Sequence, residues 1–189
     1  MNIHKLVKVL ASAGIAATVV TGLQIDNEIN TNNTIQAAEK ENSNTNYKYQ
    51  GDTGFGDGQF LLNDAFTKTL EEDGTLAFNG HEIEASKADY EKVKDEQSEF
   101  VEENDQKFTV RGDSVTKVVF PIQDEQLEID DIIDSYGDDY ELIEHKNKPY
   151  DTYVFKLGDQ EDEDEKSVIA FNVEDDYVVQ TVIGYSSSY

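Results

Sequence analysis

Few side chains in this sequence could carry out catalysis. The chain has no cysteine and three histidines, and only His81 and His145 lie beyond residue 37. Nucleophilic hydrolysis requires a base beside a serine or cysteine, and the sequence contains no Gly-x-Ser-x-Gly motif. Both histidines lie in polar, turn-like sequence, where a surface position is the usual one. We therefore expect no catalytic residues, no cofactor and no enzymatic activity.

Carboxylates are the second kind of side chain that could do chemistry, as acid–base pairs or as metal ligands. With 41 Asp and Glu residues, neighbouring carboxylates arise by chance. The densest run, Asp159–Glu165, lacks the central glycine and the ligand spacing of a calcium loop. It predicts weak, non-specific attraction of cations and no specific metal site. An acid-dependent glycan hydrolase is the alternative enzyme class, and it would require a buried carboxylate pair in a cleft.

One short motif could bind a receptor. The single arginine of the chain lies in the tripeptide Arg111-Gly112-Asp113. Arg-Gly-Asp in an extended loop is a ligand for integrin-type receptors, whereas Gly-Asp is also a common turn dipeptide. The hypothesis is that Asp113 supports cell adhesion. Equal cell adhesion to the wild type and to an Asp113→Glu variant would contradict it.

The start of the chain has the features of a secretory signal. Lys5 and Lys8 precede an apolar stretch, Val9–Leu23, and the small residues Ala37 and Ala38 follow. The apolar stretch is shorter than the ~20 residues that a transmembrane helix needs. We expect cleavage after Ala37, or after Ala38, and no membrane insertion of the mature protein. Without a cysteine or a sorting signal, no lipid or covalent wall anchor is expected, so the product is secreted or held loosely at the cell surface.

The charge of the chain restricts its partners. Residues 1–37 hold two lysines and two acids, so the remainder keeps 13 basic and 39 acidic residues and the whole net charge of −26. Binding of nucleic acid derives its affinity from basic side chains that neutralise phosphates. The charge therefore disfavours nucleic acid and anionic membranes, and it is typical of a soluble acidic surface.

Beyond the signal, we expect a single domain. Residues 38–46 are polar and predicted to be disordered, residues 47–185 form the domain, and residues 186–189 are a tail. The hydrophobic pattern predicts an α+β fold with two short helices packed on an antiparallel sheet. The elements follow one another as two helix-then-strands units. Their weak identity leaves open whether these units are an internal repeat.

The first unit begins with a helix that Asn63 caps and Gly74 ends. Leu76–Ile83 is expected to be a strand interrupted by Asn79-Gly80, or a hairpin that turns at this dipeptide, and Gly112-Asp113 predicts a hairpin before residue 122. Between these hairpins, Tyr90–Glu103 is charged throughout and is expected to be extended. The second unit has a helix over Leu127–Tyr136 that Gly137 ends. Its strands are expected at Tyr140–Glu144, Tyr150–Leu157, Ser167–Val173 and Tyr177–Tyr185.

The order of several short motifs resembles the immunodominant staphylococcal antigen B family. The motifs are Tyr47-x-Tyr49-x-Gly51, Phe60-Leu61-Leu62, Ala77-Phe78-Asn79-Gly80, the helix end from Asp131-Ile132 to Tyr136-Gly137, and a final hairpin over Val173–Gly184. The resemblance implies a small secreted, non-enzymatic antigen linked with virulence and with extracellular nucleic-acid binding. It carries over no site residues.

These observations together favour a non-enzymatic extracellular binding protein. The partner is expected to be a host or extracellular macromolecule that contacts the sheet face and loops. Nucleic acid is implied by the family resemblance and disfavoured by the charge. A gathering of the lysines, including Lys92, Lys94, Lys107 and Lys117, on one face would restore it as a ligand. An inhibitor-like interaction protein remains a third reading of the open sheet surface.

Overall fold

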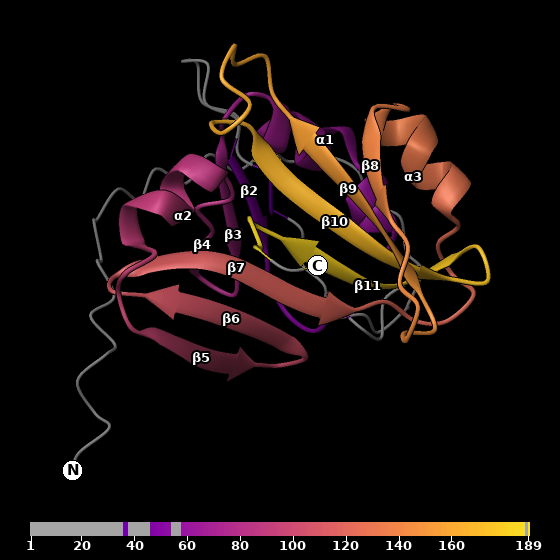
Figure 1. The fold of residues 1–189 in the computed structure, drawn as a ribbon, viewed down its shortest axis with the longest axis horizontal. Helices are drawn as coiled ribbons and strands as arrows, with labels where there is room; N and C mark the ends of the chain where they lie inside the picture. The colour runs from indigo at the N-terminus through magenta and orange to yellow at the C-terminus, as the bar shows by residue number, and fades with distance from the viewer. Residues whose placement is uncertain (1–35, 38–45, 54–57, 188) are drawn as a thin grey trace, which may run out of the picture. The chain divides into compact units, whose positions relative to one another are not determined.

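The computed structural model describes residues 36–37, 46–53, 58–187 and 189. Its strands form a four-stranded sheet of order β1-β2-β3-β4 and a seven-stranded sheet of order β5-β6-β7-β11-β10-β9-β8 (Figure 1). The smaller sheet consists of β1 (Gln36–Ala37), β2 (Asn46–Tyr49), β3 (Thr75–Phe78) and β4 (His81–Glu82). The larger sheet consists of β5 (Ser98–Glu103), β6 (Gln106–Arg111), β7 (Ser114–Pro121), β8 (Tyr140–Ile143), β9 (Asp151–Leu157), β10 (Ser167–Glu174) and β11 (Tyr177–Ile183).

Three α-helices and one 3-10 helix complete the described part of the chain. They are η1 (Gln59–Leu62), α1 (Asp64–Glu71), α2 (Lys87–Val93) and α3 (Ile129–Tyr136). The predicted α+β class is confirmed, and so are the hairpins at Asn79-Gly80 and Gly112-Asp113. Every strand pair of the seven-stranded sheet is antiparallel. In the smaller sheet β2 and β3 are parallel, because η1 and α1 carry the chain back between them.

The local signals for helix ends act as predicted in two places. The Asn63 side chain accepts a hydrogen bond from the backbone N–H of Ala65 and caps α1. Gly137 follows α3 with φ of 89°, a backbone angle that glycine adopts readily, and its N–H donates to Ile133. The paired strands that follow α3 also agree with the predicted second unit.

The expectation of extended structure over Tyr90–Glu103 is wrong in its first part, because α2 includes Tyr90 and ends at Val93. The Ser86 hydroxyl accepts a hydrogen bond from the N–H of Asp89 at 3.0 Å and caps this helix. None of the residues of α2 is buried, so no apolar stripe marks the helix in the sequence. The second part of the segment is extended as expected, and forms β5.

One hydrophobic core joins the elements of both sheets. Phe78 from the smaller sheet packs on Phe120 of β7 with ring centroids 5.4 Å apart. Phe155 and Phe171 of the larger sheet pack against Tyr136 of α3. The strands that follow α1 are therefore divided between two sheets, while the strands that follow α3 stay in one. The two units of the sequence are not equivalent in the fold.

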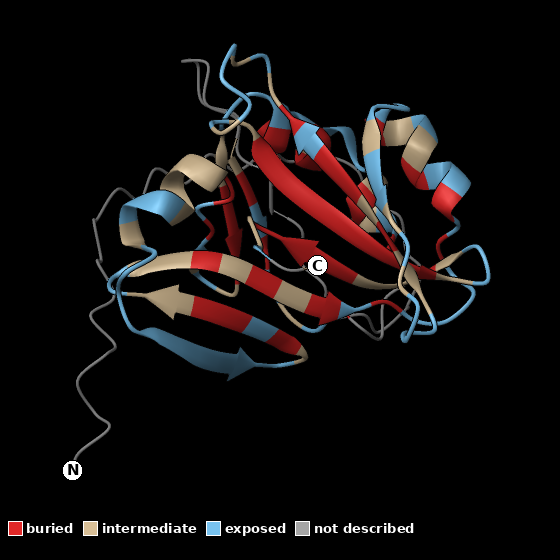
Figure 2. Cartoon of the chain, viewed as in Figure 1, coloured by how far each residue is buried: buried red, intermediate tan, exposed pale blue. Residues whose placement is uncertain are grey.

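Strand β10, which lies between β11 and β9 in the larger sheet, is buried from Ser167 to Val173, and Figure 2 shows it in red. Ile169, Phe171 and Val173 lie in the core beneath the helices. Val168 and Ala170 lie in a second cluster on the opposite face of the sheet. Because both faces of β10 are covered, its sequence is a nearly continuous apolar run.

The predicted signal and the disordered segment, residues 1–37 and 38–46, lie almost wholly outside the described residues. Ala38 is among the residues that the structure does not describe, whereas Ala37 lies in β1 and pairs with Tyr47. Cleavage after Ala37 would remove β1 and leave β2 at the edge of the smaller sheet. Among the helices in the described ranges, none is long and apolar enough to cross a membrane.

The hydroxyl of Tyr136 links α3 to η1. It donates a hydrogen bond of 2.7 Å to the carbonyl of Leu61, and both groups are buried. Burial raises the pKa of the Tyr136 hydroxyl well above its ordinary value. The Tyr136 side chain is therefore a neutral phenol in the core.

We expect Tyr136→Phe to lower the free energy of unfolding by about 1–2 kcal/mol, because the Leu61 carbonyl loses its buried donor. Urea denaturation at neutral pH measures this loss. Tyr177→Phe is the matched control, since the Tyr177 hydroxyl is exposed and lies 3.5 Å from Glu128. A loss as large in the control as in Tyr136→Phe would contradict the assigned role.

Candidate binding surface

The candidate surface, here called the open face, is the face of the seven-stranded sheet opposite the core that α1 and α3 cover; α2 contacts this face through Tyr90, whose ring lies 5.2 Å from that of Tyr185. Strand register assigns residues to it: Phe100 lies beside Thr109, Thr109 beside Lys117, and Lys107 beside Val119. The same face continues across β11, β10 and β9, where neighbouring residues of paired strands share a face. These residues are Val182, Ala170 and Val154.

The middle of the open face is apolar and largely covered. Val154, Val168, Ala170 and Val182 form a buried cluster, and Val119, Ile143, Tyr185 and Tyr189 pack against it. The Tyr189 hydroxyl donates to the carbonyl of Gly184 at 3.3 Å and accepts from the N–H of Ser186 at 3.1 Å. Burial raises the pKa of Tyr189 to about 12. The two C-terminal tyrosines therefore cover the centre of this face.

A chain of polar side chains crosses the same face toward the β8–β9 loop. The Thr152 hydroxyl donates to the Asn172 amide oxygen at 2.7 Å, and the Asn172 amide nitrogen donates to Gln180 at 2.8 Å. His145 Nε2 lies 2.9 Å from the Thr152 hydroxyl. Since that hydroxyl already donates to Asn172, it accepts from His145, which fixes the proton on Nε2. His145 thus holds its loop on the sheet.

The end of the open face near β5 is aromatic and basic. Phe100 is 64% exposed, and the Lys107 ammonium lies 4.8 Å from the centre of its ring. The Arg111 guanidinium lies 5.3 Å from the ring centre of Tyr90 on α2. Burial, and then the nearby Arg111, lower the pKa of Lys117. An exposed aromatic ring among cations is a composition that interfaces favour.

The tripeptide Arg111-Gly112-Asp113 lies at the tip of the β6–β7 hairpin. Gly112 and Asp113 are exposed. The guanidinium of Arg111 donates to the backbone carbonyls of Lys94 and Glu96, each at 3.0 Å. This arginine connects the hairpin to the segment between α2 and β5, so its geometry favours a structural role. Adhesion through Asp113 stays a prediction.

The four lysines named from the sequence divide into two groups. Lys107 and Lys117 lie on the open face, whereas Lys92 and Lys94 lie at the end of α2. Lys92 pairs with Asp89 at 2.8 Å and Lys94 with Glu91 at 2.6 Å. Lys107 also lies 3.8 Å from Glu102. The basic group on the open face is therefore small, and carboxylates neutralise part of it.

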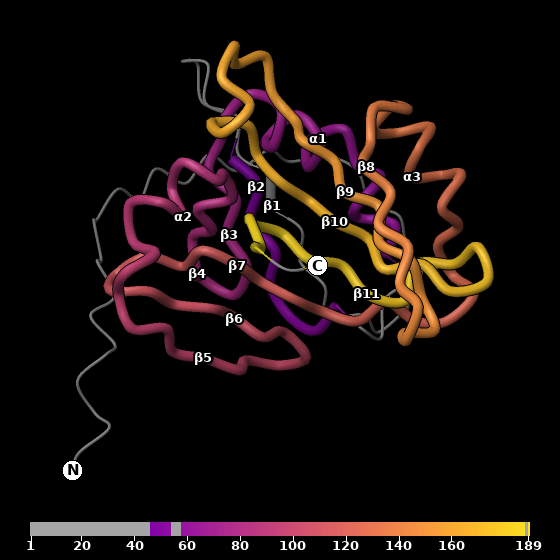
Figure 3. Tube along the Cα trace, viewed as in Figure 1, coloured from indigo at the N-terminus to yellow at the C-terminus, as the bar shows by residue number. Residues whose placement is uncertain are grey.

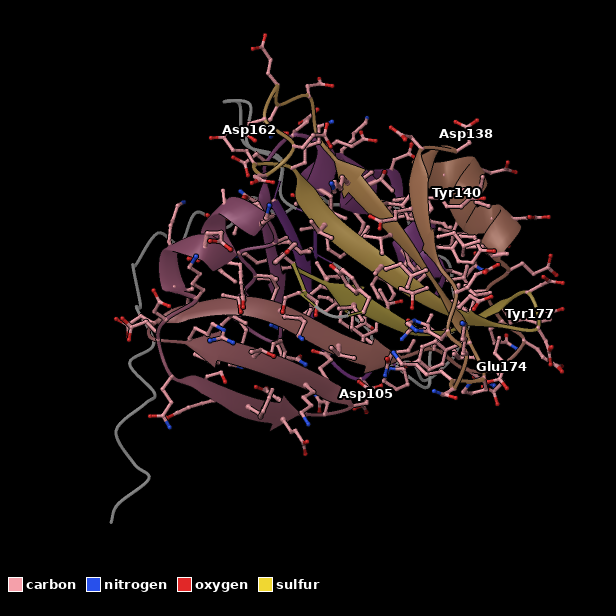
Figure 4. All side chains as sticks on the ribbon, viewed as in Figure 1. Asp105, Asp138, Tyr140, Asp162, Glu174 and Tyr177 are labelled. Atoms are coloured by element: carbon pink, nitrogen blue, oxygen red, sulfur yellow. The ribbon has the colours of Figure 1, made fainter. Side chains whose placement is uncertain are left out.

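The acidic residues are dispersed over the surface. Figure 4 shows Asp162 and Asp138 on separate loops, Glu174 at the end of β10, and Asp105 at the β5–β6 turn. In the acidic run Asp159–Glu165, Asp164 binds Lys87 at 2.9 Å and Glu163 binds Lys166 at 2.6 Å. Within the described ranges, no group of three or more His, Asp or Glu residues is placed to hold a metal ion.

His81 also has a structural environment. Its ring stacks on Phe108 with centroids 4.3 Å apart, and its Nε2 lies 3.1 Å from a carboxylate oxygen of Glu103. It joins β4 of the smaller sheet to β5 of the larger sheet. From the sequence His81 and His145 are expected at the surface, whereas in the structure each fixes a loop or a strand to its neighbour.

Phe100, Tyr90 and the terminal tyrosines are not predicted as surface contacts by any motif in the sequence. Phe100 lies among acids in Ser98–Glu103, where no apolar period explains a large aromatic residue. An aromatic residue in an otherwise charged strand was the sequence signal from which Phe100 could have been identified as a contact residue. Contacts of Tyr90 and Tyr189 depend on the register of distant strands, which the sequence does not display.

The model of the immunodominant staphylococcal antigen B (IsaB) family matches residues 46–183. The chain belongs to the IsaB family. The match spans β2 to β11 and includes the open face, so the resemblance of the short motifs is confirmed. No curated protein and no solved structure gave a significant match. Membership in the IsaB antigen family suggests an extracellular or surface protein.

We expect Arg111→Lys to lower the free energy of unfolding by about 1–2 kcal/mol, because an ammonium cannot reproduce the planar contacts to the two carbonyls and the Tyr90 ring. Thermal or urea denaturation measures the change. Asp113→Glu, at the exposed tip, is the control and should change stability by less than about 0.5 kcal/mol. An unchanged stability of Arg111→Lys would show that the arginine is free to serve another role.

Proposed function

We propose that this IsaB family member is a secreted, non-enzymatic binding protein that contacts an extracellular macromolecule through the open face. The observation that carries the proposal is the exposed Phe100 ring with the Lys107 ammonium 4.8 Å from its centre. Aromatic residues, Phe among them, are enriched at binding interfaces, where a few residues carry most of the binding energy. The protein acts outside the cell because its first 37 residues have the order of a secretory signal.

A rigid support favours this surface as a place of contact. The strands that carry Phe100, Lys107 and Lys117 pair with one another in register. The last of them, β7, also pairs with β11, which connects it to the part of the sheet that is buried on both faces. Contact residues on such strands lose little conformational entropy when a partner binds, because their backbone is already fixed. The open face is thus presented in one arrangement before binding.

The non-enzymatic part of the proposal rests on what the histidines do. His145 donates to Thr152 within the polar chain, and His81 lies against Phe108 beside Glu103. A general base must instead reach the proton of a nucleophile or a substrate. Both histidines are engaged in holding neighbouring elements together, which supports binding as the activity of the protein.

The test compares Phe100→Ala/Lys107→Glu with the wild type in surface plasmon resonance against purified host extracellular-matrix proteins, examined one at a time. We expect at least about 10-fold weaker binding for this variant to the protein that the wild type binds. Tyr150→Ala/Lys148→Glu is the matched control, because Lys148 lies 5.1 Å from the ring centre of Tyr150 on another loop. Equal losses in both variants would contradict the assignment to the open face.

Single-stranded nucleic acid is the second candidate ligand. Phe100 offers a ring on which a base could stack, and Lys107, Arg111 and Lys117 share the open face with it. The ion pair of Lys107 with Glu102 and the net charge of −26 oppose this ligand. At physiological salt, charges more than about 8 Å away are largely screened, so the local group decides the affinity.

We expect negligible binding of a single-stranded oligonucleotide at physiological salt and neutral pH, measured by mobility shift. Sub-micromolar binding that Phe100→Ala and Lys117→Glu both weaken would establish nucleic acid as the ligand of the open face. Sub-micromolar binding that neither variant changes would place the contact elsewhere and contradict the proposed surface for this ligand.

A further inference from the structure

The edge of the seven-stranded sheet at β5 is open along its whole length. In the described part of the chain β5 pairs with β6 alone, over all six of its residues. Figure 3 shows β5 at the outer end of the sheet, beside β6 and β7, and every residue of β5 is exposed. On an edge strand, alternate residues direct their backbone N–H and C=O groups away from the neighbouring strand. These groups are a template for one more strand.

The side chains of β5 combine apolar anchors with acids. Phe100 lies on the open face and is 64% exposed, and Val101 lies on the other face and is 37% exposed. Glu99 and Glu103 share the face of Val101, while Glu102 shares the face of Phe100. Asp95 and Glu96 precede the strand in the sequence. An incoming strand would therefore meet an apolar centre bordered by negative charge on both faces.

The same charges argue against a second copy of this chain as the occupant. A two-fold antiparallel pair centred on Val101 would place Glu99 of one copy opposite Glu103 of the other. Like charges directly opposite each other destabilise strand pairing. A net charge of −26 on each copy adds to the repulsion. The acids protect the edge from self-association and leave it complementary to a cationic strand.

We propose that β5 binds an extended cationic peptide segment of another protein by strand addition. The backbone of β5 supplies the hydrogen bonds, Phe100 and Val101 contact apolar side chains, and the acids contact lysine or arginine. This inference goes beyond the proposed function, because it concerns the sheet edge and a peptide partner and does not depend on Lys107 or Lys117. Recognition by strand addition takes its affinity from main-chain bonds and its specificity from alternate side chains.

The register of an antiparallel partner predicts its pattern. Basic residues lie opposite Glu99, Glu102 and Glu103, and apolar residues lie opposite Phe100 and Val101. The probe is the acetylated, amidated peptide Ser-Lys-Lys-Val-Ile-Lys-Thr-Ser. Because Glu103 and Gln106 close the two-residue turn as a hydrogen-bonded pair, Phe100 directs its backbone groups to the free edge, whereas Val101 directs its own to β6. A second peptide with proline in place of the isoleucine, which lies opposite Phe100, keeps the charge and removes a backbone donor that faces β5.

The experiment measures binding of both peptides to the whole protein at physiological salt by isothermal calorimetry, with hydrogen exchange to locate the contact. We expect the first peptide to bind and to slow exchange within residues 98–103. We expect binding at least about 10-fold weaker for the proline peptide and for a Glu99→Lys/Glu102→Lys variant. Circular dichroism checks that the variant, changed only at exposed positions, is folded.

The matched control is Glu141→Lys/Glu144→Lys at β8, the other edge of the sheet, which also carries the exposed Leu142. This control should bind the first peptide as the wild type does. Absence of binding, equal binding of the proline peptide, or equal losses in the two charge variants would overturn the proposal. Protection at β8 in place of β5 would overturn it as well.

Discussion

Burial of β10 on both faces is the constraint on which the rest of the structure depends. Phe171 anchors the strand in the core beneath the helices, and Ala170 places a small side chain in the cluster beneath the terminal tyrosines. The neighbouring strands take their register from this strand on each side. Since β10 is covered on both faces, surface for binding remains toward the outer strands of the sheet, where Phe100, Val101 and Leu142 are the exposed large apolar residues of the described part of the chain.

Several acidic side chains of this chain form ion pairs with nearby lysines. Asp164 and Glu163 bind lysines near the β9–β10 loop, and Glu91 and Asp89 bind lysines on α2. Exposed pairs of this kind contribute little to stability, at about 0–1 kcal/mol each. Their larger effect is on partners, because they neutralise much of the positive charge that a polyanion needs. Lys107, Arg111 and Lys117 lie on the two strands next to Phe100, where the net charge of the whole chain matters less than the neighbours within a Debye length.

Local signals in the sequence predicted much of the fold. Asn63 as a helix cap, Asn79-Gly80 as a hairpin turn and the apolar period of α3 each act over a few residues, and each is confirmed. The helix α2 was missed because none of its residues is buried. Parallel pairing of β2 with β3 and the polar chain through Thr152 depend on contacts between distant segments. The open face could not be assembled from sequence for the same reason, although the isolated Phe100 was visible.

The absence of cysteine allows a direct measurement of the central claim, that the open face near Phe100 contacts an extracellular partner. A Lys107→Cys variant carries one environment-sensitive dye on that face, and Lys148→Cys carries the same dye on the β8–β9 loop. Both are titrated with the extracellular-matrix protein that the wild type binds. We expect a saturable change in emission at position 107 and none at position 148. A change at position 148 alone, or none at position 107 while binding persists, would contradict it.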